Sequence, residues 1–112
     1  MFVIYHNPKC STSRKVLDQI RAAGHEPVVI DYLKDGWTRG QLWGLFAAAG
    51  LTPAQAMRTK NTPAEELGLI GADDEAIIAG MVAHPVLVER PFVATPKGVR
   101  LCRPVERLAE VL

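Results

Sequence analysis

The chain is poor in cysteine. It has two, Cys10 and Cys102, among 112 residues, and they stand far apart in the sequence. A structural disulfide is disfavoured in a reducing compartment, and two cysteines with three scattered histidines match no standard zinc spacing. We therefore expect neither a disulfide framework nor a bound metal.

Long hydrophobic runs and a strong charge of either sign are also missing. The apolar runs are too short to span a bilayer, and Met1 to Pro8 lack the basic start and long apolar stretch of a signal peptide. The formal net charge of +1 gives no reason to expect wholesale binding to nucleic acid or to an anionic membrane. We expect one domain, residues 1–112, in the cytoplasm, without a nucleic-acid or membrane partner.

The first part of the chain follows a strand–helix–strand pattern. Residues 2–5 are apolar and rich in β-formers, which predicts a buried strand that Asn7-Pro8 ends as a turn. Residues 11–23 carry one apolar face and predict a helix. Residues 27–30 predict a second strand, parallel to the first through a right-handed crossover.

The middle of the chain carries repeated helix-start signals. Thr38 and Gln41 form a capping-box pair, and the segments 52–55 and 62–65 repeat Thr-Pro-Ala followed by Gln or Glu. A further helix is expected over residues 74–83, with its apolar side chains facing inward. These are Ile77, Ile78, Met81 and Val82.

The last part of the chain returns to strands. Residues 92–94 and 99–102 flank Thr95-Pro96-Lys97-Gly98, which predicts a hairpin, and Pro104 opens a short final helix. The order is therefore βαβ, a helical insertion, a β-hairpin and a C-terminal helix. This order predicts an α/β fold of the thioredoxin-like type with a mixed four-stranded sheet.

Cys10 lies at the start of the first predicted helix. Unpaired backbone N–H groups and the positive end of the helix dipole favour a thiolate there, and Lys9 and Arg14 add positive charge. The same N–H donors, including those of Ser11 and Thr12, can hold an oxyanion. We expect Cys10 to be a reactive thiol rather than a small buried hydrophobe.

Two absent motifs narrow the chemistry. Residue 13 is Ser13, so there is no C-x-x-C pair, and Val16 stands where a tyrosine-phosphatase loop needs arginine. A redox cycle at Cys10 therefore needs a second thiol from Cys102 or from another molecule. We interpret Cys102 as a packed residue rather than a resolving thiol.

The segment Ile4-Tyr5-His6-Asn7-Pro8-Lys9-Cys10-Ser11-Thr12-Ser13-Arg14 strongly resembles the active-site start of the glutaredoxin-coupled arsenate reductases. Three later stretches fit the same family in the same order. They are Glu66-Leu67-Gly68-Leu69, His84 to Pro91, and Arg100-Leu101-Cys102-Arg103-Pro104. The resemblance extends over essentially the whole chain.

The resemblance implies a reaction and a set of roles. Cys10 would attack arsenate and form a covalent adduct, His6 would help keep it a thiolate, and Ser13 would hydrogen-bond near the sulfur. Three arginines would bind the oxyanion, with Arg14 and a cis Pro91 in support; they are Arg58, Arg90 and Arg103. Glutathione, a co-substrate rather than a bound cofactor, would attack the adduct, and glutaredoxin would reduce the mixed disulfide.

Two other functions fit the same residues. One is a glutathione-dependent monothiol oxidoreductase that acts on another substrate and still needs Cys10. The other is a non-catalytic regulator that binds the transcription machinery and tolerates Cys10→Ser. Fold alone does not separate them, because function depends on the site.

Overall fold

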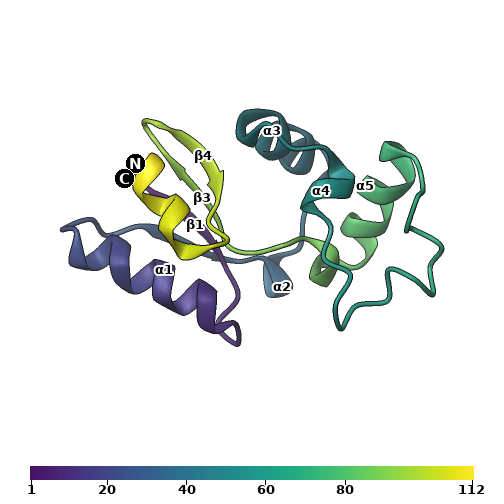
Figure 1. Cartoon of the computed structure of the whole chain (residues 1–112), viewed down its shortest axis with the longest axis horizontal. Coiled ribbons are helices and arrows are strands. Elements are labelled where there is room, and N and C mark those ends of the chain that lie inside the picture. Colours follow the sequence, from purple (N-terminus) through teal and green to yellow (C-terminus); the bar gives the residue numbers. More distant parts are fainter. The chain divides into compact units, whose positions relative to one another are not determined.

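The structure is a computed structural model that describes residues 1–112. It contains a four-stranded sheet in the order β2-β1-β3-β4 (Figure 1). The strands are β1 (Val3–His6), β2 (Val28–Asp31), β3 (Phe92–Thr95) and β4 (Gly98–Leu101). β1 pairs parallel with β2 and antiparallel with β3, and β3 pairs antiparallel with β4. The expected mixed α/β sheet is confirmed.

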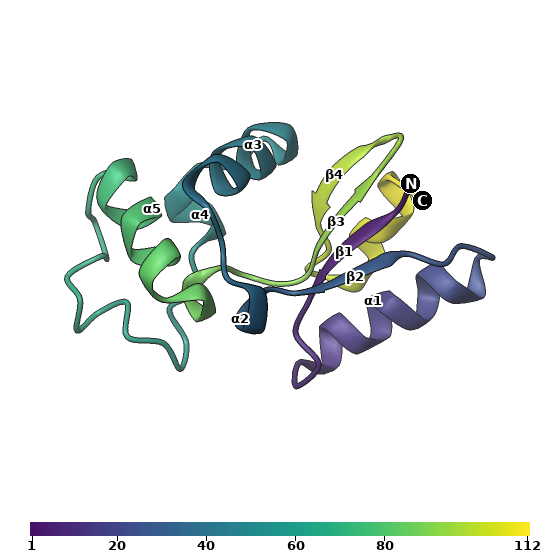
Figure 2. The same cartoon turned by 180° about the vertical axis from the view of Figure 1, so that it is seen from behind.

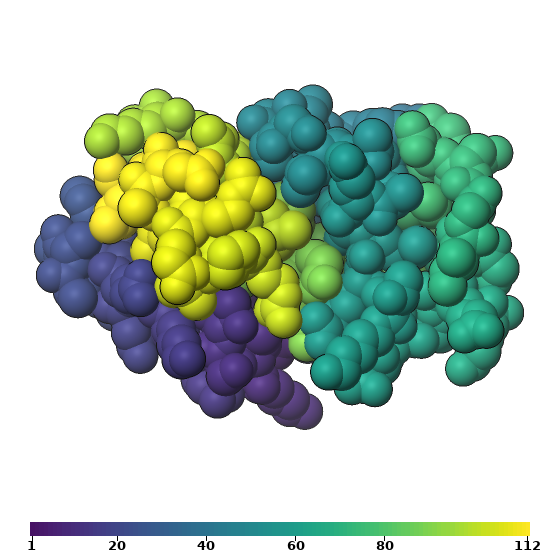
Figure 3. Space-filling view, viewed as in Figure 1, coloured from purple at the N-terminus to yellow at the C-terminus, as the bar shows by residue number.

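One face of this sheet is covered by α1 (Ser11–Ala22) and by the 3-10 helix η2 (Val105–Glu110), as Figures 1 and 2 show. Ile4 of β1 and Val93 of β3 are fully buried against them in the core. The α1 side chains in this core share one face of the helix; they are Val16, Leu17 and Ile20. The space-filling view shows the yellow C-terminal residues against the purple-blue α1 (Figure 3).

The contacts within the chain divide it into two compact units. Residues 1–35 and 90–112 form the first, which holds the whole sheet, α1, η2 and the single turn α2 (Tyr32–Asp35). Residues 36–89 form the second. That residues 1–112 act as one domain stays a prediction.

The second unit is helical. Its helices are α3 (Arg39–Ala49), α4 (Pro53–Ala56), α5 (Asp74–Ala83) and the 3-10 helix η1 (Pro85–Leu87). The expected capping boxes start α3 and α4, since the Thr38 and Thr52 side chains each accept a hydrogen bond from the N–H three residues later. α5 contacts α3, α4 and η1, and an antiparallel bridge joins Met57 to Val88.

Several local expectations differ from the structure. The start signal at Thr62 gives turns rather than a helix, although Oγ1 of Thr62 accepts the Ala64 N–H at 3.3 Å; the same hydroxyl also donates to the carbonyls of Arg58 and Thr59. Val82 is 40% exposed and does not face inward. The first strand is not buried throughout: Ile4 and His6 of β1 are buried, whereas Val3 and Tyr5 are half-buried.

No helix of this structure has the length and apolar character that crossing a membrane requires.

Candidate active site

Cys10 occupies the N-cap position of α1, with extended backbone angles of φ −95° and ψ 121°. Its side chain makes no capping hydrogen bond, and the first turn of α1 carries no acidic residue. The first N–H groups of a helix have no intrahelical acceptor, so this sulfur lies at a site that favours negative charge. Only 8% of Cys10 is exposed, so the residue is buried as well as placed at the helix end.

The surroundings of Cys10 favour its thiolate. Burial alone raises the pKa of the thiol, but the Ser13 N–H and the guanidinium groups of Arg90 and Arg103 outweigh it and lower the pKa to about 7. The surroundings therefore favour the thiolate form near neutral pH, which is the form that acts as a nucleophile.

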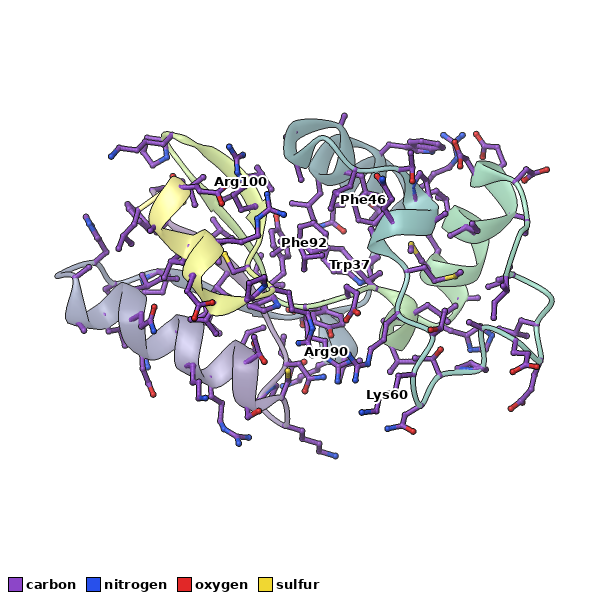
Figure 4. All side chains as sticks on the ribbon, viewed as in Figure 1. Trp37, Phe46, Lys60, Arg90, Phe92 and Arg100 are labelled. Atoms are coloured by element: carbon purple, nitrogen blue, oxygen red, sulfur yellow. The ribbon has the colours of Figure 1, made fainter.

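Arg90 and Arg103 come to Cys10 from the two chain segments at the open end of the hairpin, where Phe92 pairs with Leu101. Arg90 lies two residues before β3 (Figure 4), and Arg103 lies two residues after β4. Nη1 of Arg103 lies 3.8 Å from Sγ of Cys10 and donates to the carbonyl oxygen of Arg90 at 3.2 Å. Nε of Arg90 is buried without a hydrogen-bond partner, so an anion bound beside the sulfur would satisfy it.

His6 and Ser13 form a buried pair beside Cys10. Nδ1 of His6 lies 2.6 Å from Oγ of Ser13, and Oγ accepts the Asn7 N–H at 3.0 Å. Burial lowers the pKa of His6, with opposing attraction from Asp31, so the imidazole is neutral at pH 7. The direction of the bond between Nδ1 and the Ser13 hydroxyl depends on the tautomer of the ring. His6 makes no hydrogen bond to the sulfur.

The remaining residues expected at the site take different positions. Ser11 is exposed and Thr12 half-buried in the first turn of α1, where their N–H groups can reach an anion. Arg14 donates to the Pro8 carbonyl at 2.8 Å, so it supports the loop. The peptide bond between Arg90 and Pro91 is cis, as the family resemblance implies.

Arg58 lies in the second unit and is tied there to Glu89. Its Nη1 is 3.1 Å from Oε1 of Glu89, and its Nε donates to the carbonyl of Lys60. Its backbone N–H donates to the carbonyl of Leu87. The two side chains are 12% and 21% exposed. A role for Arg58 in binding an oxyanion stays a prediction.

Cys102 is fully buried in the core between the sheet, α1 and η2. Burial raises the pKa of its thiol to about 12. A thiol that is neither ionised nor exposed at neutral pH is a poor nucleophile. No group of three His, Cys, Asp or Glu side chains is placed to hold a metal ion.

Asn7 also lies at the site, although its sequence context indicates only a turn. The structure buries the Asn7 side chain and bonds it to the backbone of the Cys10 loop. This burial cannot be read from the sequence, so no local pattern marks the residue.

The chain is similar to known proteins over nearly its whole length. The model of the ArsC family matches residues 5–111. The chain belongs to the ArsC family. An arsenate reductase of Synechocystis sp. is 58% identical over 100% of this chain and 81% of its own length. An arsenate reductase of Escherichia coli is 46% identical over 97% of this chain and 79% of its own length.

Solved structures place this ArsC family member in the same fold. An arsenate reductase from Vibrio cholerae superposes with a TM-score of 0.92 and 39% identity, covering 99% of this chain and 97% of that chain. The fold is therefore the thioredoxin-like α/β fold of the ArsC family, as expected from the order of elements.

Proposed function

We propose that this protein is an arsenate reductase that uses Cys10 as its nucleophile. The observation that carries the proposal is the Cys10 sulfur at the N-terminus of α1, with the Arg103 guanidinium 3.8 Å away. The arsenate reductases among its relatives support the choice of substrate.

The chemistry of the site suits arsenate. Arsenate carries roughly one to two negative charges near neutral pH, and guanidinium groups bind such oxyanions through paired hydrogen bonds. Arg90 and Arg103 supply these groups, and the N–H groups at the start of α1 can add further donors. The same positive groups favour the thiolate that attacks.

The first proposed step joins sulfur to arsenic. The Cys10 thiolate attacks arsenic, a bond forms between Sγ and arsenic, and one arsenate oxygen leaves as water after protonation. Arg90 and Arg103 would bind the remaining oxygens and offset their charge as the bond forms. Arsenic stays at oxidation state five in this covalent adduct.

The second proposed step reduces arsenic. Glutathione thiolate attacks Sγ of Cys10, a disulfide forms, and the electron pair of the sulfur–arsenic bond goes to arsenic, which leaves as arsenite after a two-electron reduction. A dithiol glutaredoxin then attacks the mixed disulfide and releases the Cys10 thiolate. The external thiol is needed because Cys102 is buried and un-ionised.

Turnover of arsenate in a coupled assay tests this function. The assay contains glutathione, glutaredoxin, glutathione reductase and NADPH, and it compares the wild-type protein with Cys10→Ser. We expect NADPH oxidation that depends on arsenate, and its loss in the variant. The matched control is Cys102→Ser, which should keep the activity.

A folded, reduced wild-type protein without arsenate turnover would contradict the proposal. Omitting glutathione or glutaredoxin singly tests the two reductants, because each omission should stop turnover. Activity with another disulfide or oxyanion substrate would instead favour a glutathione-dependent monothiol oxidoreductase. Binding of transcription proteins that survives Cys10→Ser would favour the regulator.

A further inference from the structure

Asn7 has a buried polar side chain at the junction between β1 and the loop that carries Cys10. Only 4% of Asn7 is exposed, and burying a carboxamide is unfavourable unless its polar atoms are hydrogen-bonded. Its Oδ1 accepts a hydrogen bond from the Lys9 N–H at 3.0 Å. The side chain therefore restrains the backbone of the residue that precedes Cys10.

The backbone of Asn7 restrains the same loop at two more points. Its carbonyl accepts the Cys10 N–H at 3.0 Å, and its N–H donates to Oγ of Ser13 at 3.0 Å. Pro8 lies between Asn7 and Lys9, with a fixed φ and no N–H to donate. The turn over residues 7–10 is therefore held by bonds that converge on Asn7.

Cys10 cannot hold this turn with its own side chain. It is the N-cap residue of α1, where Ser, Thr, Asn or Asp normally fix the helix start through a side-chain acceptor. The Cys10 side chain makes no capping bond of ordinary geometry, and the Ser13 N–H near it favours the thiolate instead. The side-chain restraint on this turn comes from Asn7, three residues earlier, which accepts the Lys9 N–H.

The neutrality of Asn7 matters as much as its shape. Aspartate forms the same turn, with a carboxylate oxygen as acceptor, but it would add a negative charge to the loop. That charge would oppose the positive groups that act on the sulfur, which are Arg90 and Arg103 at the open end of the hairpin. Lys9 and Arg14 are exposed cations of the same loop and of the first turn of α1, and His6 at the end of β1 is neutral at pH 7.

We propose that Asn7 is a positioning residue of this active site: its neutral amide oxygen fixes the turn that presents the Cys10 sulfur at the N-terminus of α1 without placing a negative charge beside it. The inference deepens the proposed function and rests on it only for the role of Cys10 as nucleophile. The geometry of the turn does not depend on the identity of the substrate.

The test measures alkylation of Cys10 by iodoacetamide from pH 5 to 9, with Cys10 and Cys102 peptides quantified separately by mass spectrometry. It needs no arsenate, so failure of the proposed function does not affect its outcome. Four variants are compared with wild type: Asn7→Asp, Asn7→Ala, Asn7→Ser and the control Asn61→Asp. Asn61 is exposed, lies in the second unit, and receives the same chemical change.

We expect Asn7→Asp to raise the pH midpoint of alkylation by about one unit, which makes the reaction about tenfold slower at pH 6. Amide exchange of Lys9 should stay as slow as in wild type in this variant. In Asn7→Ala the Lys9 amide should exchange about two- to tenfold faster, in line with the loss of one hydrogen bond. Asn7→Ser keeps a short side-chain acceptor, so its Lys9 amide should exchange nearly as slowly as in wild type.

The inference is overturned if Asn7→Asp keeps the wild-type midpoint, or if Asn7→Ala keeps wild-type exchange at Lys9 and wild-type reactivity at Cys10. An equal shift in Asn61→Asp would also overturn it, because the effect would then not be local. If Asn7→Asp does not fold, the comparison of Asn7→Ala with Asn7→Ser decides. Equal exchange and equal reactivity in that pair would remove the side chain from the positioning role.

Discussion

Arg103 reaches across the first unit to Cys10, 93 residues away in the sequence, with Nη1 3.8 Å from Sγ. The same nitrogen holds the carbonyl of Arg90, so one guanidinium contacts the nucleophile and orders the backbone of the other arginine. This double contact makes Arg103 the side chain whose loss should disturb the site in the most ways.

Replacing Arg103 should raise the pKa of Cys10 and weaken the binding of an oxyanion. For Arg103→Ala we expect kcat/KM for arsenate to fall about 100-fold, in line with the loss of a charged hydrogen-bonding group. Arg103→Lys should recover only part of this, because an ammonium group lacks the planar pair of donors. Arg107→Ala, in an exposed ion pair with Glu110, is the control. Wild-type kinetics in Arg103→Ala would remove this residue from the site.

The two thiols should differ in reactivity. The pKa of Cys10 is lowered to about 7 and that of Cys102 is raised to about 12. Iodoacetamide at pH 7 should therefore modify Cys10 and leave Cys102 intact until the protein is unfolded by denaturant. Mass spectrometry of the labelled peptides measures both rates in one sample. Equal labelling of the two in the native protein would contradict the assigned environments.

The Cys10 thiolate should also couple stability to pH. The pKa of the thiol is lowered in the folded protein from its ordinary value of 9.0, so the contribution of the thiolate to stability is present above pH 9 and is lost as the pH falls through about 7. The difference in free energy of unfolding between wild type and Cys10→Ser should thus shift in favour of wild type by about 1 to 2 kcal/mol from pH 6 to 9, after allowance for solvent screening. Urea denaturation at several pH values measures it. A flat difference would mean that the folded protein does not stabilise the thiolate.

The bond between His6 and Ser13 allows a test of the His6 tautomer. The Ser13 oxygen accepts the Asn7 N–H, and we expect its proton to point to Nδ1 of the neutral imidazole, with the ring proton on Nε2. Nitrogen-15 NMR of the His6 ring should show this tautomer at pH 7. In Ser13→Ala the preference should weaken, and the pH midpoint of Cys10 alkylation should rise. A proton found on Nδ1 in wild type would reverse the assigned direction of the bond.

The ion pair of Arg58 with Glu89 allows the effect of Arg58 on stability to be separated from any effect on arsenate binding. Both side chains are largely buried, so removing either partner should lower the free energy of unfolding by about 1 to 3 kcal/mol. If Arg58 also binds the oxyanion, Arg58→Ala raises the KM for arsenate well beyond the effect of Glu89→Ala. Chemical denaturation and steady-state kinetics of both variants and the double variant measure the two effects. An equal change of KM in both single variants would restrict Arg58 to a structural role.

Local chemistry explains what the sequence could predict. The capping boxes at Thr38 and Thr52 were predictable because all their partners lie within three residues, and the βαβ order followed from short apolar runs separated by turns. The position of Cys10 at the start of α1 followed in the same way from its place between a strand and a helix. The cis peptide before Pro91 and the mixed sheet agree with the family resemblance.

Contacts outside the expected motifs account for what could not be predicted. Thr62 has the same signal as Thr52 and accepts the Ala64 N–H, but its hydroxyl also donates to the carbonyl of Arg58, and turns follow in place of a helix. Arg58 and Glu89 meet through the bridge between Met57 and Val88, which no local pattern indicates. The hydrogen bond of His6 to Ser13, rather than to the Cys10 sulfur, joins two side chains that are both buried, and their burial cannot be read from the sequence.

The start of α1, where the N-cap side chain makes no capping bond, implies that stability and activity favour different residues at position 10. A serine at position 10 could accept a hydrogen bond from the first turn of α1, and such a cap contributes about 1 kcal/mol, which the cysteine forgoes. At acidic pH, where the thiolate contributes nothing, the inactive Cys10→Ser protein should therefore melt at a higher temperature than wild type. Selection for stability alone would replace this cysteine, so only its chemistry can retain it.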